Sequence, residues 1–160
     1  MRTVEDIVRK LIAKGVTVAA AESCTGGKIA AAVTDVAGAS AIFGYGLVTY
    51  SNEAKVKLLG VSEKTLLEHG AVSEETAREM AAGLSRVSGA DAAVAVTGIA
   101  GPGGGTAAKP VGLVYIGLAV GGEIDVKKNL FSGDRGEIRR QTVETALALI
   151  AEKCLENEWD

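Results

Sequence analysis

Aromatic residues make up only 4% of the 160-residue sequence, so the core has to be built from Ala, Val, Ile and Leu. Glycine is abundant, with 21 residues, and such small residues suit the close packing of an α/β protein. No apolar run approaches the roughly 20 residues that span a bilayer, and we expect no membrane partner. The formal net charge is −3 and basic residues form no stripe, which argues against nucleic acid as a partner.

The sequence is also poor in the side chains that bind metals. It has two cysteines, Cys24 and Cys154, and one histidine, His69, and these do not resemble a metal site. We therefore expect the protein to work without a metal and without a cofactor. Two thiols in a chain with no signal peptide indicate a reducing, cytoplasmic location. The length predicts a single domain over residues 1–160.

Apolar periodicity and helix-start signals predict a chain in which helices alternate with strands. Helices are expected over residues 3–14, 26–36, 62–69 and 73–88, over a short segment through 55–59 capped by Ser51 or Asn52, and from Asp134, with Glu137 three positions on, to about Glu156. Strands are expected over residues 16–21, 43–50, 91–99, 111–120 and 124–131.

Gly121 and Gly122, between the last two strands, predict a tight hairpin, which makes one strand antiparallel to its neighbour. The predicted fold is therefore α/β, a three-layer α/β/α sandwich with a mixed, mostly parallel sheet of about five strands, one of them antiparallel. Ligands of such sheets bind beyond the carboxyl ends of the parallel strands. The turns after the first and second strands and the glycine loop after the third are expected to meet there.

The first of these turns interrupts a run of small apolar residues with Glu22-Ser-Cys-Thr25, followed by Gly26 and Gly27. The Ser23 hydroxyl would lie near the backbone amides of Thr25, Gly26 and Gly27 at the positive end of a helix, which suits a nucleophile whose product is an oxyanion. In the alternative interpretation, Ser23 or Thr25 only caps the helix. The sequence matches neither the Gly-x-Ser-x-Gly elbow nor the phosphate-binding loop that ends in Gly-Lys.

A serine nucleophile needs a base, and His69 lies at a predicted helix end, where a structural role is expected. Lys55, just past the second strand, is the better candidate, since desolvation can lower the pKa of a lysine. Tyr50, at the end of that strand, could relay a proton or hold the substrate. A solvated surface lysine is the alternative for Lys55. Cys24 is either a rival nucleophile or a small buried side chain.

The loop from Gly98 to Gly105 follows Thr97, and its exposed amides could wrap an anion such as phosphate. It could equally be a flexible connection. Arg135 and Arg139 lie at the start of the last predicted helix, next to its core-facing stripe and toward the same sheet edge. Each could also be a solvated helix residue.

Taken together, these segments resemble the CinA C-terminal domain family, the nicotinamide-nucleotide amidohydrolases, in its stand-alone form. The resemblance rests on Ala21-Glu-Ser-Cys-Thr-Gly-Gly27, Val48-Thr-Tyr-Ser-Asn-Glu-Ala-Lys55, His69-Gly-Ala-Val-Ser73, Ala95-Val-Thr-Gly-Ile-Ala-Gly-Pro-Gly-Gly-Gly105, Lys109-Pro-Val-Gly112 and Phe131-Ser-Gly-Asp-Arg135. These blocks occur in the family's order and cover nearly the whole chain. The N-terminal domain of two-domain relatives has no counterpart here, so we do not expect its functions.

The resemblance implies hydrolysis of the carboxamide of nicotinamide mononucleotide to nicotinate mononucleotide and ammonia. It implies Ser23 as nucleophile, Lys55 as base and Tyr50 as a site residue. Substrate binding is expected from Thr25, Gly26, Gly27, Thr97, Gly98, Gly101, Gly103, Gly104 and Arg139. A non-catalytic nucleotide-binding module using the same glycine loop is the alternative function, and the family's name alone suggests a third, an interaction protein in DNA uptake or damage response. The partner is expected to be a pyridine mononucleotide, and the protein a homo-oligomer.

Overall fold

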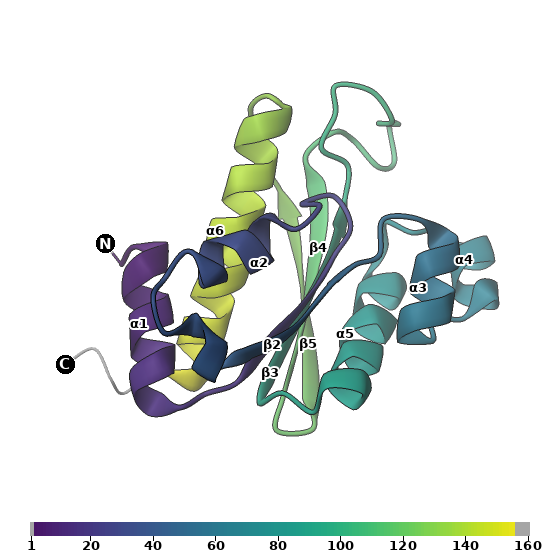
Figure 1. Ribbon diagram of the computed structural model, residues 1–160. Coiled ribbons are helices and arrows are strands. Elements are labelled where there is room, and N and C mark those ends of the chain that lie inside the picture. Colours follow the sequence, from purple (N-terminus) through teal and green to yellow (C-terminus); the bar gives the residue numbers. More distant parts are fainter. Residues whose placement is uncertain (1, 156–160) are drawn as a thin grey trace.

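The computed structural model describes residues 2–155 and contains a five-stranded mixed sheet in the order β2-β1-β3-β4-β5 (Figure 1). The strands are β1 (Val18–Glu22), β2 (Phe43–Val48), β3 (Ala92–Gly98), β4 (Leu113–Val120) and β5 (Glu123–Leu130). The helices are α1 (Val4–Lys14), α2 (Lys28–Thr34), α3 (Asn52–Leu59), α4 (Glu63–His69), α5 (Glu74–Ser88) and α6 (Arg135–Cys154), with a short 3-10 turn over Ala39–Ala41.

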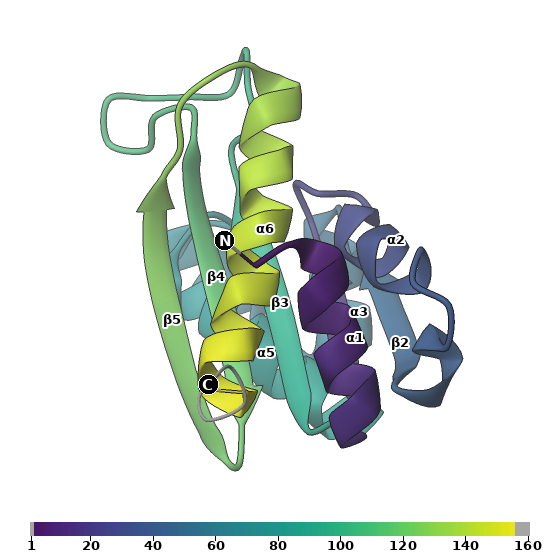
Figure 2. The same ribbon diagram turned by 90° about the vertical axis from the view of Figure 1, so that its left-hand side faces the viewer.

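The sheet has the predicted topology. Strand β1 pairs in parallel with β2 and β3, whereas β4 is antiparallel to both β3 and β5. Helices α1, α2 and α6 cover one face, and α3, α4 and α5 lie on the other (Figures 1 and 2). The three-layer α/β/α class and the single antiparallel strand are thus confirmed. None of the helices among the described residues is long and apolar enough to cross a membrane.

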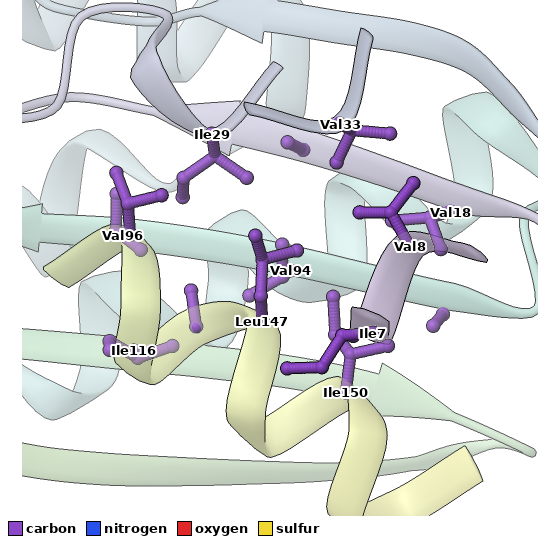
Figure 3. Packing of buried hydrophobic residues seen from close by; sticks show 14 of the residues in the cluster. Ile7, Val8, Val18, Ile29, Val33, Val94, Val96, Ile116, Leu147 and Ile150 are labelled. Atoms are coloured by element: carbon purple, nitrogen blue, oxygen red, sulfur yellow. The ribbon is translucent and has the colours of Figure 1, made fainter. Parts of the chain in front are cut away.

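The two faces of the sheet are packed with side chains of different size. On the α1, α2 and α6 face, Leu147 and Ile150 of α6 lie over Val94 and Ile116 of the sheet (Figure 3). On the other face the strands contribute mainly alanines, which pack beneath α5. Side chains that alternate between faces and are buried on both explain the continuous apolar strands of the sequence.

Glycine lets α5 lie close to its neighbours on the alanine-rich face. A Cβ atom at Gly83 would stand 1.8 Å from the carbonyl oxygen of Leu59, the last residue of α3. Only glycine allows two backbones to approach this closely. The close contact fixes α3, and therefore Lys55 in its second turn, against the rest of that layer.

Most of the predicted helix starts are confirmed. Ser51 caps α3, Ser73 caps α5, and Asp134 with Glu137 forms a capping box on α6. Ser62 precedes α4 but makes no capping hydrogen bond through its side chain. The last predicted helical residue, Glu156, lies outside the described residues.

The first strand and the helix after it differ from the prediction. Strand β1 runs to Glu22, and α2 begins only at Lys28, because Gly26 and Gly27 have φ angles of 57° and 107° that no right-handed helix accommodates. Neither Ser23 nor Thr25 caps α2, so the capping interpretation was wrong. The cap comes from Glu22, whose buried carboxylate accepts hydrogen bonds from the amides of Ile29 and Ala30.

Candidate active site

The carboxyl ends of β1, β2 and β3 converge on one pocket, as the topology predicted. Its volume is about 300 Å³. The pocket is lined by Ser23, Cys24, Tyr50, Lys55, Ala71, Val72, Thr97, Gly98, Ile99, Ala100, Gly101, Gly103, Gly104 and Arg135. Figure 1 shows that the loop after β3 and the start of α6 rise at the same end of the sheet. No carboxylate is among the lining residues described, so the pocket favours an anionic ligand.

Ser23 and Lys55 meet at the base of this pocket. The Lys55 Nζ atom lies 3.0 Å from the Ser23 Oγ atom, within hydrogen-bond distance. The same nitrogen donates hydrogen bonds to the carbonyl oxygens of Thr49 at 2.8 Å and Tyr50 at 3.2 Å. Only 1% of Lys55 is exposed, so the alternative of a solvated surface lysine is contradicted.

Burial changes the protonation of Lys55. Desolvation lowers the pKa of its amine from 10.5 to about 8, because charge is poorly solvated away from water, and no described carboxylate forms an ion pair with it. A neutral amine has two N–H groups and one lone pair. The two carbonyl oxygens can accept both N–H groups, which leaves the lone pair for the Ser23 hydroxyl. In its charged form Lys55 donates to Ser23 Oγ, whose hydroxyl lies 3.5 Å from the Tyr50 carbonyl, whereas a neutral amine in the same place has the lone pair that a base needs.

The turn that carries Ser23 is held on two sides. Glu22 attaches it to the start of α2, as described above. From α6, Arg139 donates through Nε to the Cys24 carbonyl and through Nη2 to the Thr25 carbonyl, each at 3.0 Å. Within the turn, the Gly26 amide donates to the Ser23 carbonyl at 3.1 Å. That amide is therefore already engaged and is not free to bind an oxyanion, contrary to expectation.

The opposite wall of the pocket combines polar side chains with the glycine loop. Arg135 donates through Nη1 to the Gly101 carbonyl at 2.7 Å and through Nη2 to the Tyr50 hydroxyl at 3.3 Å. Thr97 donates to the Ala71 carbonyl at 2.8 Å. Arg135 thereby connects the end of the second strand to the glycine loop across the pocket.

The pocket does not gather every predicted residue. Ser23, Lys55, Tyr50, Thr97, Gly98, Gly101, Gly103 and Gly104 line it, whereas Thr25, Gly26, Gly27 and Arg139 do not. Substrate binding was expected from Arg139 and not from Arg135, but only Arg135 of the two lines the pocket, and no role was predicted for Ala71 and Val72. The only signal for these two residues was the block from His69 to Ser73 in the family resemblance, because their side chains have no chemistry of their own.

Neither Cys24, which lines the pocket, nor His69 has the surroundings of a catalytic residue. Burial raises the pKa of the Cys24 thiol to about 11, so it stays protonated at neutral pH, and its side chain belongs to the hydrophobic core. His69 does not line the pocket, and its ring nitrogens lie 3.9 Å from Glu68 and 3.7 Å from Glu75. Within residues 2–155, no group of three or more His, Cys, Asp or Glu side chains could hold a metal.

This α/β/α domain, with a buried serine–lysine pair at the carboxyl ends of its parallel strands, belongs to the CinA C-terminal domain family, whose sequence profile matches residues 1–154. A relative in Escherichia coli (strain K12), named nicotinamide-nucleotide amidohydrolase PncC, is 49% identical over 158 residues and covers 98% of this chain and 96% of its own.

Longer relatives share the same domain. A CinA-like protein of Kosmotoga olearia is 52% identical over 149 residues, which are 92% of this chain. The chain spans 36% of the length of that relative, and also 36% of a relative in Alkaliphilus metalliredigens that is 54% identical.

Solved structures of the family have the same fold. A competence/damage inducible protein from Agrobacterium tumefaciens matches with a TM-score of 0.90 at 46% identity, covering 95% of this chain and 98% of its own. A competence damage-inducible protein from Klebsiella pneumoniae also matches with a TM-score of 0.90, at 39% identity, and covers 99% of this chain and all of its own.

Proposed function

We propose that residues 1–160 form a single-domain amidohydrolase that converts nicotinamide mononucleotide to nicotinate mononucleotide and ammonia. The observation that carries the proposal is the buried Lys55 amine 3.0 Å from the Ser23 hydroxyl, in a pocket with no carboxylate among its described lining residues. The full-length similarity to the E. coli relative named nicotinamide-nucleotide amidohydrolase supports the choice of substrate.

The first half of the reaction acylates Ser23. Its Oγ atom attacks the carboxamide carbon while its proton passes to the neutral Lys55 amine. Backbone amides of the turn after Ser23 stabilise the resulting oxyanion. The C–N bond then breaks, the proton moves from Lys55 to the leaving nitrogen, and ammonia departs.

The second half of the reaction hydrolyses the ester on Ser23. Water attacks the ester carbon and gives a proton to Lys55. This attack forms a second tetrahedral oxyanion. The bond between the carbonyl carbon and Ser23 Oγ breaks, and the proton returns from Lys55 to that oxygen. The product is released as a carboxylic acid that gives its proton to solvent and becomes a carboxylate, and the enzyme regains its starting protonation.

Arg135 is the residue we assign to the phosphate of the nucleotide. It carries the only guanidinium among the described residues that line the pocket. Its planar fork of N–H donors matches phosphate oxygens, and the glycine-loop amides beside it add further donors. Tyr50, whose hydroxyl contacts Arg135, is then assigned to the mouth of the pocket above Lys55.

The deciding experiment replaces Ser23 with alanine. We expect Ser23→Ala to release no ammonia from nicotinamide mononucleotide above background and to keep the wild-type melting temperature. Ser40→Ala, an exposed serine in the 3-10 turn, is the matched control and should be fully active. Full activity of Ser23→Ala would refute the mechanism. If wild-type protein released no ammonia but the nucleotide raised its melting temperature, the chain would be a nucleotide-binding module instead.

A further inference from the structure

We propose that Arg139 is a positioning residue that orients the Cys24–Thr25 peptide next to the nucleophile, and that it does not bind the nucleotide. This inference rests on the proposed amidohydrolase function. It replaces the sequence-based expectation that Arg139 contacts the substrate. The two roles predict different kinetic effects, so they can be separated by experiment.

The first argument is that the guanidinium of Arg139 is bonded to the turn and lies outside the pocket lining. Its Nε and Nη2 atoms donate to the carbonyl oxygens of Cys24 and Thr25, both at 3.0 Å. The guanidinium also lies against the turn, since a Cβ atom added to Gly26 would stand 3.2 Å from Nη2. Arg139 is half-buried and does not line the pocket, whereas Arg135, one helical turn earlier, does.

The second argument concerns the direction of the backbone amides. The only cis peptide among the described residues is Gly101–Pro102, so the Cys24–Thr25 peptide is trans, with its N–H directed opposite to its carbonyl. Because Arg139 holds the Cys24 carbonyl toward α6, the Thr25 amide points the other way. This amide donates no hydrogen bond to any described residue.

The third argument is that Arg139 is the one donor to the Cys24 carbonyl among the described residues, although backbone hydrogen bonds hold Ser23 and Thr25 on either side. The left-handed glycines that follow, Gly26 and Gly27, give the backbone wide conformational freedom. Glu22 holds the far end of the turn, through the amides of Ile29 and Ala30. Preorganised amides next to a nucleophile are the usual donors to an oxyanion, and their effect depends on their orientation before the reaction. Arg139 supplies that orientation for Thr25.

The test compares three variants of the full chain with wild type. Arg139→Gln removes the charge and one of the two contacts, Arg139→Lys keeps the charge and one donor, and Arg140→Gln is the matched control. Arg140 is the next residue on α6 and forms only an exposed ion pair with Glu144. Each protein is assayed for ammonia release from nicotinamide mononucleotide, and its backbone amides are recorded by nuclear magnetic resonance.

We expect Arg139→Gln to lower kcat at least about tenfold, toward the roughly 10²-fold that loss of an oxyanion donor costs, with KM nearly unchanged. Arg139→Lys should recover part of kcat, and Arg140→Gln should match wild type. The amide resonances of Thr25 and Gly26 should shift in Arg139→Gln and stay in place in Arg140→Gln. A merely structural role would lower the melting temperature without this separation of kcat from KM.

Two kinetic results would overturn the inference. A raised KM with unchanged kcat in Arg139→Gln would mean that Arg139 binds the nucleotide, and unchanged kinetics would mean that it has no role. If wild-type protein released no ammonia, the proposed function would fail, and the amide resonances alone would decide. Shifts at Thr25 and Gly26 confined to the Arg139 variants would then support the positioning role, and their absence would refute it.

Discussion

Two lysines at opposite ends of the sheet have opposite surroundings and opposite pKa shifts. At the carboxyl ends of the parallel strands, Lys55 is 1% exposed, contacts only uncharged groups, and burial lowers its pKa to about 8. At the opposite end, the side chain of Lys153 is 40% exposed and lies 3.0 Å from Asp125 and 3.6 Å from Glu123. There the hydrogen bond that Lys153 donates to Asp125 raises the lysine pKa.

Neighbouring polar groups differ in the same way. At the Lys55 end, the buried hydroxyls of Thr25 and Thr49 find no hydrogen-bond partner among the described residues. At the other end, the hydroxyl of Thr17 is paired with the carboxylate of Asp91. An unpaired buried polar group destabilises a fold by about 1–3 kcal/mol. The fold therefore tolerates unpaired buried polar groups at the end of the sheet where we place the chemistry. At the other end, charged side chains form solvent-exposed ion pairs.

The largest effect is expected on catalytic activity, when Lys55 is replaced. Lys55→Met should lower ammonia release from nicotinamide mononucleotide about 10³-fold at pH 7.5, within the range that general acid–base catalysis contributes. Lys57→Met, an exposed position on the same helix, should leave the rate unchanged. Steady-state assays of both variants measure the difference. A Lys55→Met enzyme with more than a tenth of wild-type activity would remove Lys55 from the mechanism.

The burial of Lys55 should also make the free energy of unfolding depend on pH. Below pH 8 the Lys55 amine is protonated in both states, and the fold bears the full penalty of a buried charge. Between pH 8 and 10.5 the unfolded chain still holds a proton that the folded protein has released, so stability rises with pH. Relative to Lys55→Met, wild type should gain about 3 kcal/mol in unfolding free energy over this interval. Urea titrations at pH 7 and 10.5 measure it, and a constant difference would contradict the buried-amine account.

A smaller effect is expected at the mouth of the pocket. Arg135→Gln should raise KM for nicotinamide mononucleotide tenfold or more, the equivalent of about 1.5–3 kcal/mol for a hydrogen bond to a charged group, and should change kcat less. KM for nicotinamide riboside, which lacks the phosphate, should not change. An equal rise in KM for both substrates would mean that Arg135 does not recognise phosphate.

The smallest effect is expected at the other end of the sheet. Lys153→Ala removes an exposed lysine from its two carboxylates, and exposed ion pairs contribute little to stability. The melting temperature and ammonia release should both stay close to wild type. A large loss of either would show that the two ends do not differ as described.

The order of elements was predictable because apolar runs and helix-start residues are local signals. The meeting of Ser23 with Lys55 was predictable because parallel strands end at one edge of a sheet. The cap on α2 could not be predicted, because Glu22 accepts a hydrogen bond from the amide of Ile29, seven residues away. No local sequence pattern indicates such a contact. Arg135 and Arg139 lie one helical turn apart on the same side of α6. Only the folded structure distinguishes Arg135, which lines the pocket, from Arg139, which holds the turn.

The central claim is that a buried, readily deprotonated Lys55 activates Ser23, and the pH dependence of kcat/KM for nicotinamide mononucleotide tests it most directly. We expect kcat/KM to rise from pH 7 and to level off above an apparent pKa of about 8, the value set by burial of Lys55. A profile that is flat between pH 7 and pH 10, or that keeps rising toward the ordinary lysine value, would contradict it.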